Sequence, residues 1–341
     1  MSDMLNLGII GFGRIGAEHA GWIGASKTTR VAGVADATPA RRELAESRGL
    51  RTTADVDELL NDSTVQAVLI AVPTAMHFDL AMRAIAAGKH VMIEKPMAVD
   101  FAQSEHLAVE ADRRGLMLSV FHNRRWDIDY LTVKDAISSG VLGKLINIES
   151  RLGQFASCVG PAAKEYRPNW RNEAAFGGGG LYDWGSHFVD QLWQLLLPAR
   201  PVRVFAQLRA NVWSRDCDDF ARVAIDFDND VAALVEINTT TARPLPRWHL
   251  DGALGSASAP HSPAFDTNVW AQLQFTPAEG GQSRALPTAR PGLTETMIWD
   301  QFAAAVAGGG QPAVLAQSVL TTMQLLDAAR ASARLGQAVA L

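Results

Sequence analysis

The chain has 341 residues, of which 48% are hydrophobic and 20% are charged, and its formal net charge at pH 7 is −5. This length suggests two domains, and a mildly negative chain without a basic run argues against a nucleic-acid-binding protein. No apolar run approaches the roughly 20 residues that span a bilayer, and the N-terminus lacks a basic segment and a cleavage signal, so we expect a cytoplasmic protein with no membrane partner.

The first predicted elements are a buried strand over 5–10 and a helix over 17–23, joined by Gly-Phe-Gly-Arg-Ile-Gly. In this setting the G-x-G-x-x-G pattern is typical of a dinucleotide site, because the glycines allow a tight turn and close approach of a pyrophosphate to the helix N-terminus. A second strand over 31–35 ends in Asp36, whose carboxylate can bond ribose hydroxyls and repels a 2′-phosphate. We therefore predict NAD as the cofactor. NADP is the alternative if Arg41 or Arg42 reaches the phosphate, although solvation on the helix surface is their ordinary role. The residues assigned to this site are Gly11, Phe12, Gly13, Arg14, Ile15, Gly16 and Asp36.

Strands and helices continue to alternate up to residue 122, with strands over 65–72, 89–93 and 116–121 and helices over 41–48, 55–60, 77–87 and 104–114. This order predicts a parallel sheet with right-handed crossovers, in which ligands bind at the carboxyl ends of the strands. Polar residues stand at these ends: Asp36, Thr74, Glu94, Lys95, His122, Asn123 and Arg124. In Glu94-Lys95-Pro96 we interpret Lys95 as a cation directed into the cleft rather than as part of a solvated turn. Pro96 can fix an unusual cis backbone there.

After Trp126 the alternation stops. We expect helices over 131–139, 294–307 and 314–335, and strands over 144–152, 202–212, 219–227, 231–241 and 247–250. Residues 153–176 are expected to be irregular, and 251–292 to form loops and hairpins around strands such as 269–275. Consecutive strands with short turns predict a mostly antiparallel sheet, so this half is of the α+β class. Cys158 and Cys217 are far apart and share no ligand spacing, so we expect reduced thiols and no metal site.

A run of four glycines over 177–180 leads into a predicted helix that ends near Pro198. Asp183 and His187 lie four residues apart and therefore share one face of this helix. A carboxylate and an imidazole projecting together can move a proton at neutral pH. The alternative is a helix N-terminus with a hydrogen-bonded core histidine. Trp170 and Trp184 flank this stretch and either pack in the core or line a sugar-sized pocket.

Taken in order, these motifs resemble the glucose–fructose oxidoreductase/inositol dehydrogenase (Gfo/Idh/MocA) family over essentially the whole chain. The resemblance rests on G-F-G-R-I-G, Glu94-Lys95-Pro96, Trp170-Arg171 and the glycine-rich Asp183-x-x-x-His187. Phe-His-Asn-Arg-Arg-Trp-Asp at 121–127 is especially similar to the scyllo-inositol dehydrogenase branch, whereas the loop-rich region after Leu250 departs from the family's continuous strands. The resemblance implies an α/β Rossmann parallel-sheet domain over 1–122 and an α+β domain with an open, mostly antiparallel sheet over 123–341. It also implies a nicotinamide cofactor, a sugar or polyol substrate, and a homodimer or homotetramer formed through the sheet.

The same resemblance places Lys95, Asp183 and His187 at catalytic positions. His187 would take a hydroxyl proton, Lys95 would stabilise charge on the same oxygen, and Asp183 would orient a neighbouring hydroxyl or His187. Substrate contacts fall on Lys95, Arg124, Asp183 and His187. Further cofactor contacts fall on Pro73, Thr74, His77, Glu94, Lys95, Asn123, Trp170 and Arg171. The expected activity is hydride transfer between NAD(P) and a secondary hydroxyl of an inositol-like polyol or sugar. A glycosidase that transiently oxidises its substrate with bound NAD is one alternative, and a cofactor-binding sensor without turnover is the other.

Overall fold

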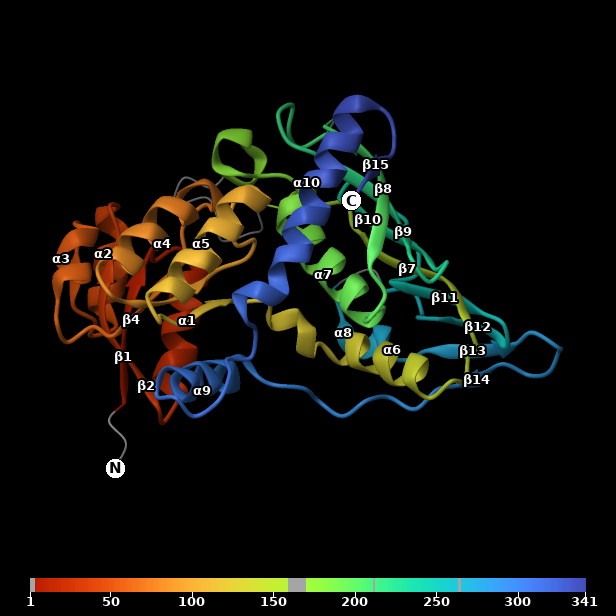
Figure 1. The fold of residues 1–341 in the computed structure, drawn as a ribbon, viewed down its shortest axis with the longest axis horizontal. Helices are drawn as coiled ribbons and strands as arrows, with labels where there is room; N and C mark the ends of the chain where they lie inside the picture. The colour runs from red at the N-terminus through yellow and green to blue at the C-terminus, as the bar shows by residue number, and fades with distance from the viewer. Residues whose placement is uncertain (1–3, 159–169, 211, 263–264) are drawn as a thin grey trace.

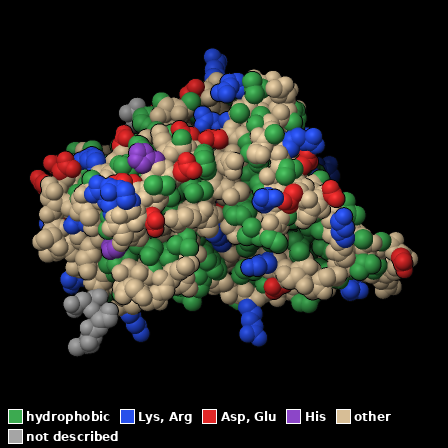
Figure 2. Space-filling model, viewed as in Figure 1, with side chains coloured by type: hydrophobic (Ala, Val, Ile, Leu, Met, Phe, Trp, Pro, Cys, Tyr) green, Lys and Arg blue, Asp and Glu red, His purple; other side chains and the backbone are tan. Residues whose placement is uncertain are grey.

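A computed structural model of the chain describes residues 4–158, 170–210, 212–262 and 265–341, so the segment expected to be irregular over 153–176 lies partly outside the described residues. Figure 1 shows two halves side by side, each built on its own sheet. On the face drawn in Figure 2, basic and acidic side chains are interspersed and neither sign dominates. Within the described part of the chain, no helix combines the length and the apolar character needed to cross a membrane.

The first half is a six-stranded parallel sheet in the order β3-β2-β1-β4-β5-β6. Its strands are β1 (Leu5–Ile10), β2 (Thr29–Ala35), β3 (Thr52–Thr53), β4 (Ala67–Ile70), β5 (His90–Ile93) and β6 (Leu118–Val120). Its helices are α1 (Arg14–Ala25), α2 (Pro39–Ser47), α3 (Val56–Asn61), α4 (His77–Ala86) and α5 (Phe101–Arg113). Every residue of β4 is buried, as expected for a strand covered on both faces. The strand order reverses between β1 and β4, so the loops that follow these strands border a crevice suited to a ligand.

The second half is a nine-stranded sheet in the order β14-β13-β12-β11-β7-β10-β9-β8-β15. Its strands are β7 (Leu145–Gly153), β8 (Pro201–Arg209), β9 (Phe220–Phe227), β10 (Ala232–Asn238), β11 (Trp248–Gly252), β12 (Gly255–Ser258), β13 (Gln274–Pro277), β14 (Arg284–Ala285) and β15 (Val339–Ala340). All pairs are antiparallel except β7 with β10. The predicted fold class, a Rossmann-like parallel sheet followed by a mostly antiparallel sheet, is confirmed.

Helices cover one face of the second sheet and separate it from the first half (Figure 1). They are α6 (Ile128–Ser138), α7 (Ser186–Leu195) and α10 (Leu320–Leu335). Helix α7 is buried along nearly its whole length. It packs against β7 and β10 on one side and against α10 on the other. The helix that carries His187 is therefore packed on both sides, in the layer between the two sheets.

Helix α9 (Glu295–Val306) returns from the C-terminal part of the chain to the first half (Figure 1). Its buried residues Ile298, Trp299 and Phe302 belong to the same core cluster as Ile9 and Phe12 of the N-terminal strand and loop. The first half is thus completed by a helix nearly 300 residues away in sequence, because the apolar face of α9 buries itself against α1 and β2.

Two predicted elements differ in the structure. The strand predicted over 269–275 is wrong in its first part, because residues Thr267–Trp270 form the short helix α8 and β13 begins only at Gln274. The side chain of Asp266 accepts hydrogen bonds from the backbone N–H groups of Asn268 and Val269, which starts the helix. The helix predicted over 314–335 begins as a 3₁₀ turn over Ala316–Val319, and α10 follows from Leu320.

Candidate active site

The loop after β1 and the first turn of α1 leave no room for a side chain at Gly11 or Gly16. Gly11 has a φ of +93°, and a Cβ there would lie 2.5 Å from the carbonyl oxygen of Ala71. A Cβ on Gly16 would lie 2.1 Å from the carbonyl oxygen of Gly11. Gly13 precedes α1 without a side-chain cap, so the first N–H groups of the helix face the loop without a competing side-chain acceptor. This backbone cradle fits the pyrophosphate of a dinucleotide.

Asp36 stands at the end of β2, beside this loop, and is 7% exposed. Its Oδ2 accepts a hydrogen bond from the Phe12 N–H at 2.7 Å, and its Oδ1 accepts one from the Thr38 N–H at 2.8 Å. Arg41 Nη1 lies 3.6 Å from Oδ2, and Arg42 Nη1 donates to the Asp36 carbonyl oxygen at 2.7 Å. Both arginines therefore turn back to Asp36 instead of lying solvated on the helix surface. The end of β2 therefore combines a carboxylate with a nearby cation.

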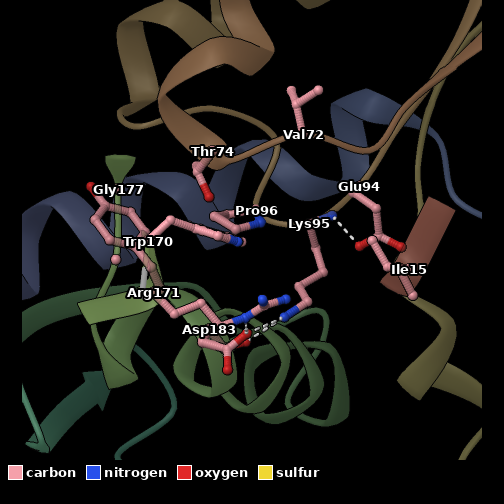
Figure 3. A pocket seen from close by; sticks show the side chains of 12 residues that line it. Ile15, Val72, Thr74, Glu94, Lys95, Pro96, Trp170, Arg171, Gly177 and Asp183 are labelled. Atoms are coloured by element: carbon pink, nitrogen blue, oxygen red, sulfur yellow. Dashed lines mark hydrogen bonds and ion pairs between the residues drawn. The ribbon is translucent and has the colours of Figure 1, made fainter. Parts of the chain in front are cut away.

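Lys95, Asp183 and Arg171 form one ion cluster in the crevice (Figure 3). Lys95 Nζ donates to Asp183 Oδ1 at 3.0 Å and to the Asp183 carbonyl oxygen at 2.7 Å. Arg171 Nε donates to the same Oδ1 at 3.2 Å. Burial alone raises the pKa of Asp183, but the charges and hydrogen bonds of the two cations outweigh it and bring this pKa down to about 2. Asp183 is thus a permanent anion that holds Lys95 in place.

His187 lies one turn further along the same helix and is 4% exposed. Burial, then the charges of Lys95 and Arg124, lower its pKa well below the ordinary value of 6.5, so the neutral ring prevails at pH 7. Its ring stands edge-on to that of His122, with centroids 5.6 Å apart. Among the residues the structure describes, its Nδ1 has no hydrogen-bond partner, and Asp183 bonds the two cations rather than this ring. His187 therefore lies near groups at the carboxyl edge of the first sheet and is in the form that accepts a proton.

The glycine run is shaped by Asp218, which the sequence did not single out. Gly179 has a φ of +114°, and a Cβ there would lie 2.3 Å from Asp218 Oδ1. Asp218 Oδ2 accepts a hydrogen bond from the Leu181 N–H at 2.7 Å, and its carbonyl oxygen accepts one from the Gly180 N–H at 2.8 Å. Residues Leu181–Gly185 then form a π-helical turn ahead of α7. Such turns are frequent at functional sites, and this one carries Asp183.

One pocket brings many of the predicted site residues together (Figure 3). It lies between the carboxyl edge of the first sheet and the glycine run. Its lining residues are Ile15, Val72, Thr74, Glu94, Lys95, Pro96, Trp170, Arg171, Gly177, Gly178, Tyr182 and Asp183. The Lys95–Pro96 peptide is cis. Trp170 thus contributes to a pocket wall and carries the Arg171 guanidinium over its ring at 4.4 Å.

Other predicted contact residues have partners of their own. His77 is buried, with Nδ1 and Nε2 each 2.9 Å from a backbone carbonyl oxygen, those of Pro96 and Val72. Asn123 donates to Glu295 Oε1 at 3.3 Å. Arg124 donates to Asp127 at 3.1 Å, and its guanidinium lies over the rings of Trp184 and Phe265. Across the described ranges, no group of three or more His, Cys, Asp or Glu side chains is arranged to hold a metal ion.

Comparison with known proteins agrees with this geometry. A family model described as an oxidoreductase family with an NAD-binding Rossmann fold matches residues 5–122, and the GFO/IDH/MocA C-terminal domain matches residues 130–258. Inositol 2-dehydrogenase 2 of Saccharopolyspora erythraea is 30% identical over 280 residues, which are 80% of this chain and 78% of that protein. The chain belongs to the Gfo/Idh/MocA oxidoreductase family. The resemblance found in its motifs is confirmed, and so is a Rossmann domain that binds NAD.

Other proteins are also similar to this chain. The uncharacterized oxidoreductase YdgJ of Escherichia coli is 35% identical over 63% of this chain and 61% of its own length, which is less than two thirds. The scyllo-inositol 2-dehydrogenase (NADP(+)) IolW of Bacillus subtilis is 29% identical over 73% of this chain and 67% of its own length. Among solved structures, an NAD-binding protein from Listeria innocua superposes with a TM-score of 0.88 at 28% identity, covering 99% of this chain and 97% of that one.

Proposed function

We propose that this oxidoreductase is an NAD(P)-dependent dehydrogenase that oxidises a secondary hydroxyl of a sugar or cyclic polyol. One observation carries the proposal: Lys95 Nζ is held on Asp183 in a pocket whose lining also includes Ile15 of the dinucleotide loop. A cation fixed beside the cofactor loop is what stabilisation of an alkoxide requires. The names of IolW and of inositol 2-dehydrogenase 2 point to inositol-like substrates.

The pyrophosphate would rest on the backbone around Gly11 and Gly13, and the adenosine ribose would lie beside Asp36. When bound, the nicotinamide supplies the hydride acceptor. An ammonium group has three donors, and the structure shows Lys95 using donors on the carbonyl and carboxylate oxygens of Asp183. The remaining N–H would hold the substrate oxygen and stabilise its negative charge. His187, with its neutral ring, would take the hydroxyl proton.

A substrate panel tests this proposal. Inositols, aldoses and anhydrosugars are offered to the protein with NAD or NADP, and formation of reduced nicotinamide is followed by absorbance. Net reduction with at least one polyol or sugar is expected. Cleavage of aryl glycosides without net reduction would instead identify the transient-oxidation glycosidase. Tight cofactor binding without either reaction would identify the sensor. Neither of these two alternatives is favoured by the relatives, whose names are those of dehydrogenases and oxidoreductases.

A further inference from the structure

A buried histidine outside the proposed catalytic set links helix α9 to Lys95. His19 lies on α1 and is 0% exposed. Its Nδ1 lies 3.1 Å from Trp299 Nε1 of helix α9, and its Nε2 lies 2.8 Å from Glu94 Oε1. An indole N–H can only donate, so Nδ1 of His19 must be the acceptor. The ring proton is therefore on Nε2 and is donated to Glu94.

Aromatic rings keep this imidazole from turning. The rings of Phe121, Trp22 and Trp299 stand edge-on to His19, with centroids 4.3, 4.8 and 5.5 Å away. They come from three different parts of the chain: the end of β6, α1 itself, and α9. A ring enclosed this way has one available orientation, so the direction of its N–H toward Glu94 is fixed.

The chain of hydrogen bonds continues from Glu94 to Lys95. The second carboxylate oxygen of Glu94, Oε2, accepts the backbone N–H of Lys95 at 3.0 Å. Burial raises the pKa of Glu94, but the hydrogen bond from His19 and the charge of Lys95 lower it overall. The charge of this carboxylate also acts on His77 and His122, raising the pKa of each against the larger effect of burial. Each carboxylate oxygen of Glu94 thus accepts one hydrogen bond. Oε1 accepts it from the His19 ring, and Oε2 accepts it from the Lys95 backbone N–H.

We propose that His19 is a positioning residue for Lys95. By holding Glu94 in one orientation, it fixes the backbone from which the Lys95 side chain reaches Asp183. Helix α9 takes part through Trp299, whose indole N–H holds His19 in the tautomer that can donate to Glu94. The inference rests on the role proposed for Lys95, but the hydrogen-bond chain can be tested without turnover.

The experiment measures how fast Lys95 is acylated by a lysine-specific reagent in the protein without cofactor, read by peptide mass spectrometry. Lys144, which is exposed, and Lys89, which is buried on backbone carbonyl oxygens, serve as internal references. His19→Leu removes both hydrogen bonds and leaves a ring-sized apolar group. We expect the acylation rate of Lys95 to rise about tenfold relative to that of Lys144. We also expect kcat to fall by up to about 10²-fold with the KM for cofactor little changed, because misplacing a catalytic group slows the chemical step.

His19→Gln, whose amide can both donate and accept, should restore most of the parent behaviour. Trp22→Phe is the matched control, because this ring packs on His19 and the hydrogen-bond chain does not pass through it. If His19→Leu does not fold, Trp299→Phe is tested in its place, because it keeps an aromatic ring at this position and removes the indole N–H that donates to His19. We then expect acylation to rise about threefold, as for the loss of one neutral hydrogen bond.

A lower melting temperature of His19→Leu with parent values of Lys95 acylation and kcat would overturn the inference and leave His19 a purely structural residue. A parent rate of acylation in Trp299→Phe would do the same. If no polyol or sugar is turned over by the parent protein, the proposed function fails. The acylation measurement still decides whether His19 positions Lys95.

Discussion

Among single residues, we expect His187 to set the pH dependence of the proposed reaction. Its folded pKa lies well below 6.5 because the ring is buried and stands near Lys95 and Arg124. A base with this pKa stays unprotonated in mildly acidic solution, so the acid limb of kcat/KM should lie below pH 6.5. In the unfolded chain His187 takes up a proton near pH 6.5, whereas in the folded protein it does so only at lower pH. Its contribution to the stability of the folded protein is therefore complete above pH 6.5 and is lost as the pH falls toward the folded pKa.

His187→Asn should therefore lower kcat by about 10²-fold or more and remove this acid limb. The melting temperature at pH 7 should stay near that of the parent, because asparagine can fill the polar position. The measurements are a pH–rate profile and thermal melts. Parent turnover in His187→Asn would show that this histidine is a core residue, the alternative that the sequence left open.

Asp36 and Arg41 together should set the choice between NAD and NADP. Asp36 keeps lone pairs for ribose hydroxyls beyond its bonds to backbone N–H groups, and its charge opposes a 2′-phosphate. Arg41, 3.6 Å away, offsets part of that charge. We expect NAD to bind more tightly, and Arg41→Ala to widen the preference about tenfold, or 1.4 kcal/mol. Titration calorimetry with both dinucleotides measures this, with Arg42→Ala as the control. Tenfold tighter binding of NADP by the parent would contradict it.

Sequence reasoning could name Lys95, Asp183 and His187 because each stands in a short motif whose chemistry is local. It could not show that Asp183 would bond Lys95 and Arg171 instead of His187, since that depends on how the two halves meet. His19 and Asp218 were missed because each acts through a partner distant in sequence: His19 through Glu94, and Asp218 through the backbone of Leu181.

At the scale of elements, the glycine run and the π-helical turn form one unit that presents Asp183. Gly179→Ala should destabilise the protein by about 1–3 kcal/mol, because its φ of +114° and its contact with Asp218 leave no place for a methyl group. Turnover should fall with it. Gly24→Ala on helix α1 is the matched control: its Cβ meets no atom within 4 Å, so it should stabilise by about 0.5–1 kcal/mol. Urea unfolding measures both, and equal stability of the two variants would refute this account.

Most helices and strands, such as β4 and α7, were predictable from the periodicity of apolar residues and from glycines near the ends of the elements. The π-helical turn was not, because its register depends on packing against Asp218 and β10 rather than on a local residue pattern. The sequence before residue 269 contains a signal for the short helix that replaces the first part of the strand predicted over 269–275. Asp266 followed by Thr267 and Asn268 is a good N-cap sequence, and its capping bonds outweigh the strand propensity of Val269.

At the scale of the whole molecule, the second sheet leaves the face opposite its helices without a covering layer (Figure 1). Phe205 on that face is 41% exposed and pairs in register with Ala224, which pairs with Leu234. We propose that this row lies in a homodimer interface. Phe205→Asp should then raise the dimer dissociation constant about 30-fold or more. Light scattering after gel filtration measures this, with Val109→Asp on α5 as the control. A monomeric parent protein would refute the proposal.

We propose that Lys95, held on Asp183 beside the dinucleotide loop, stabilises the substrate oxygen during oxidation. The most direct test compares the parent with Lys95→Ala in two measurements, kcat with the best polyol of the panel and the dissociation constant for NAD. We expect kcat to fall about 10²–10³-fold while NAD binding changes little. Parent turnover in Lys95→Ala would contradict it and reduce Glu94-Lys95-Pro96 to a structural turn.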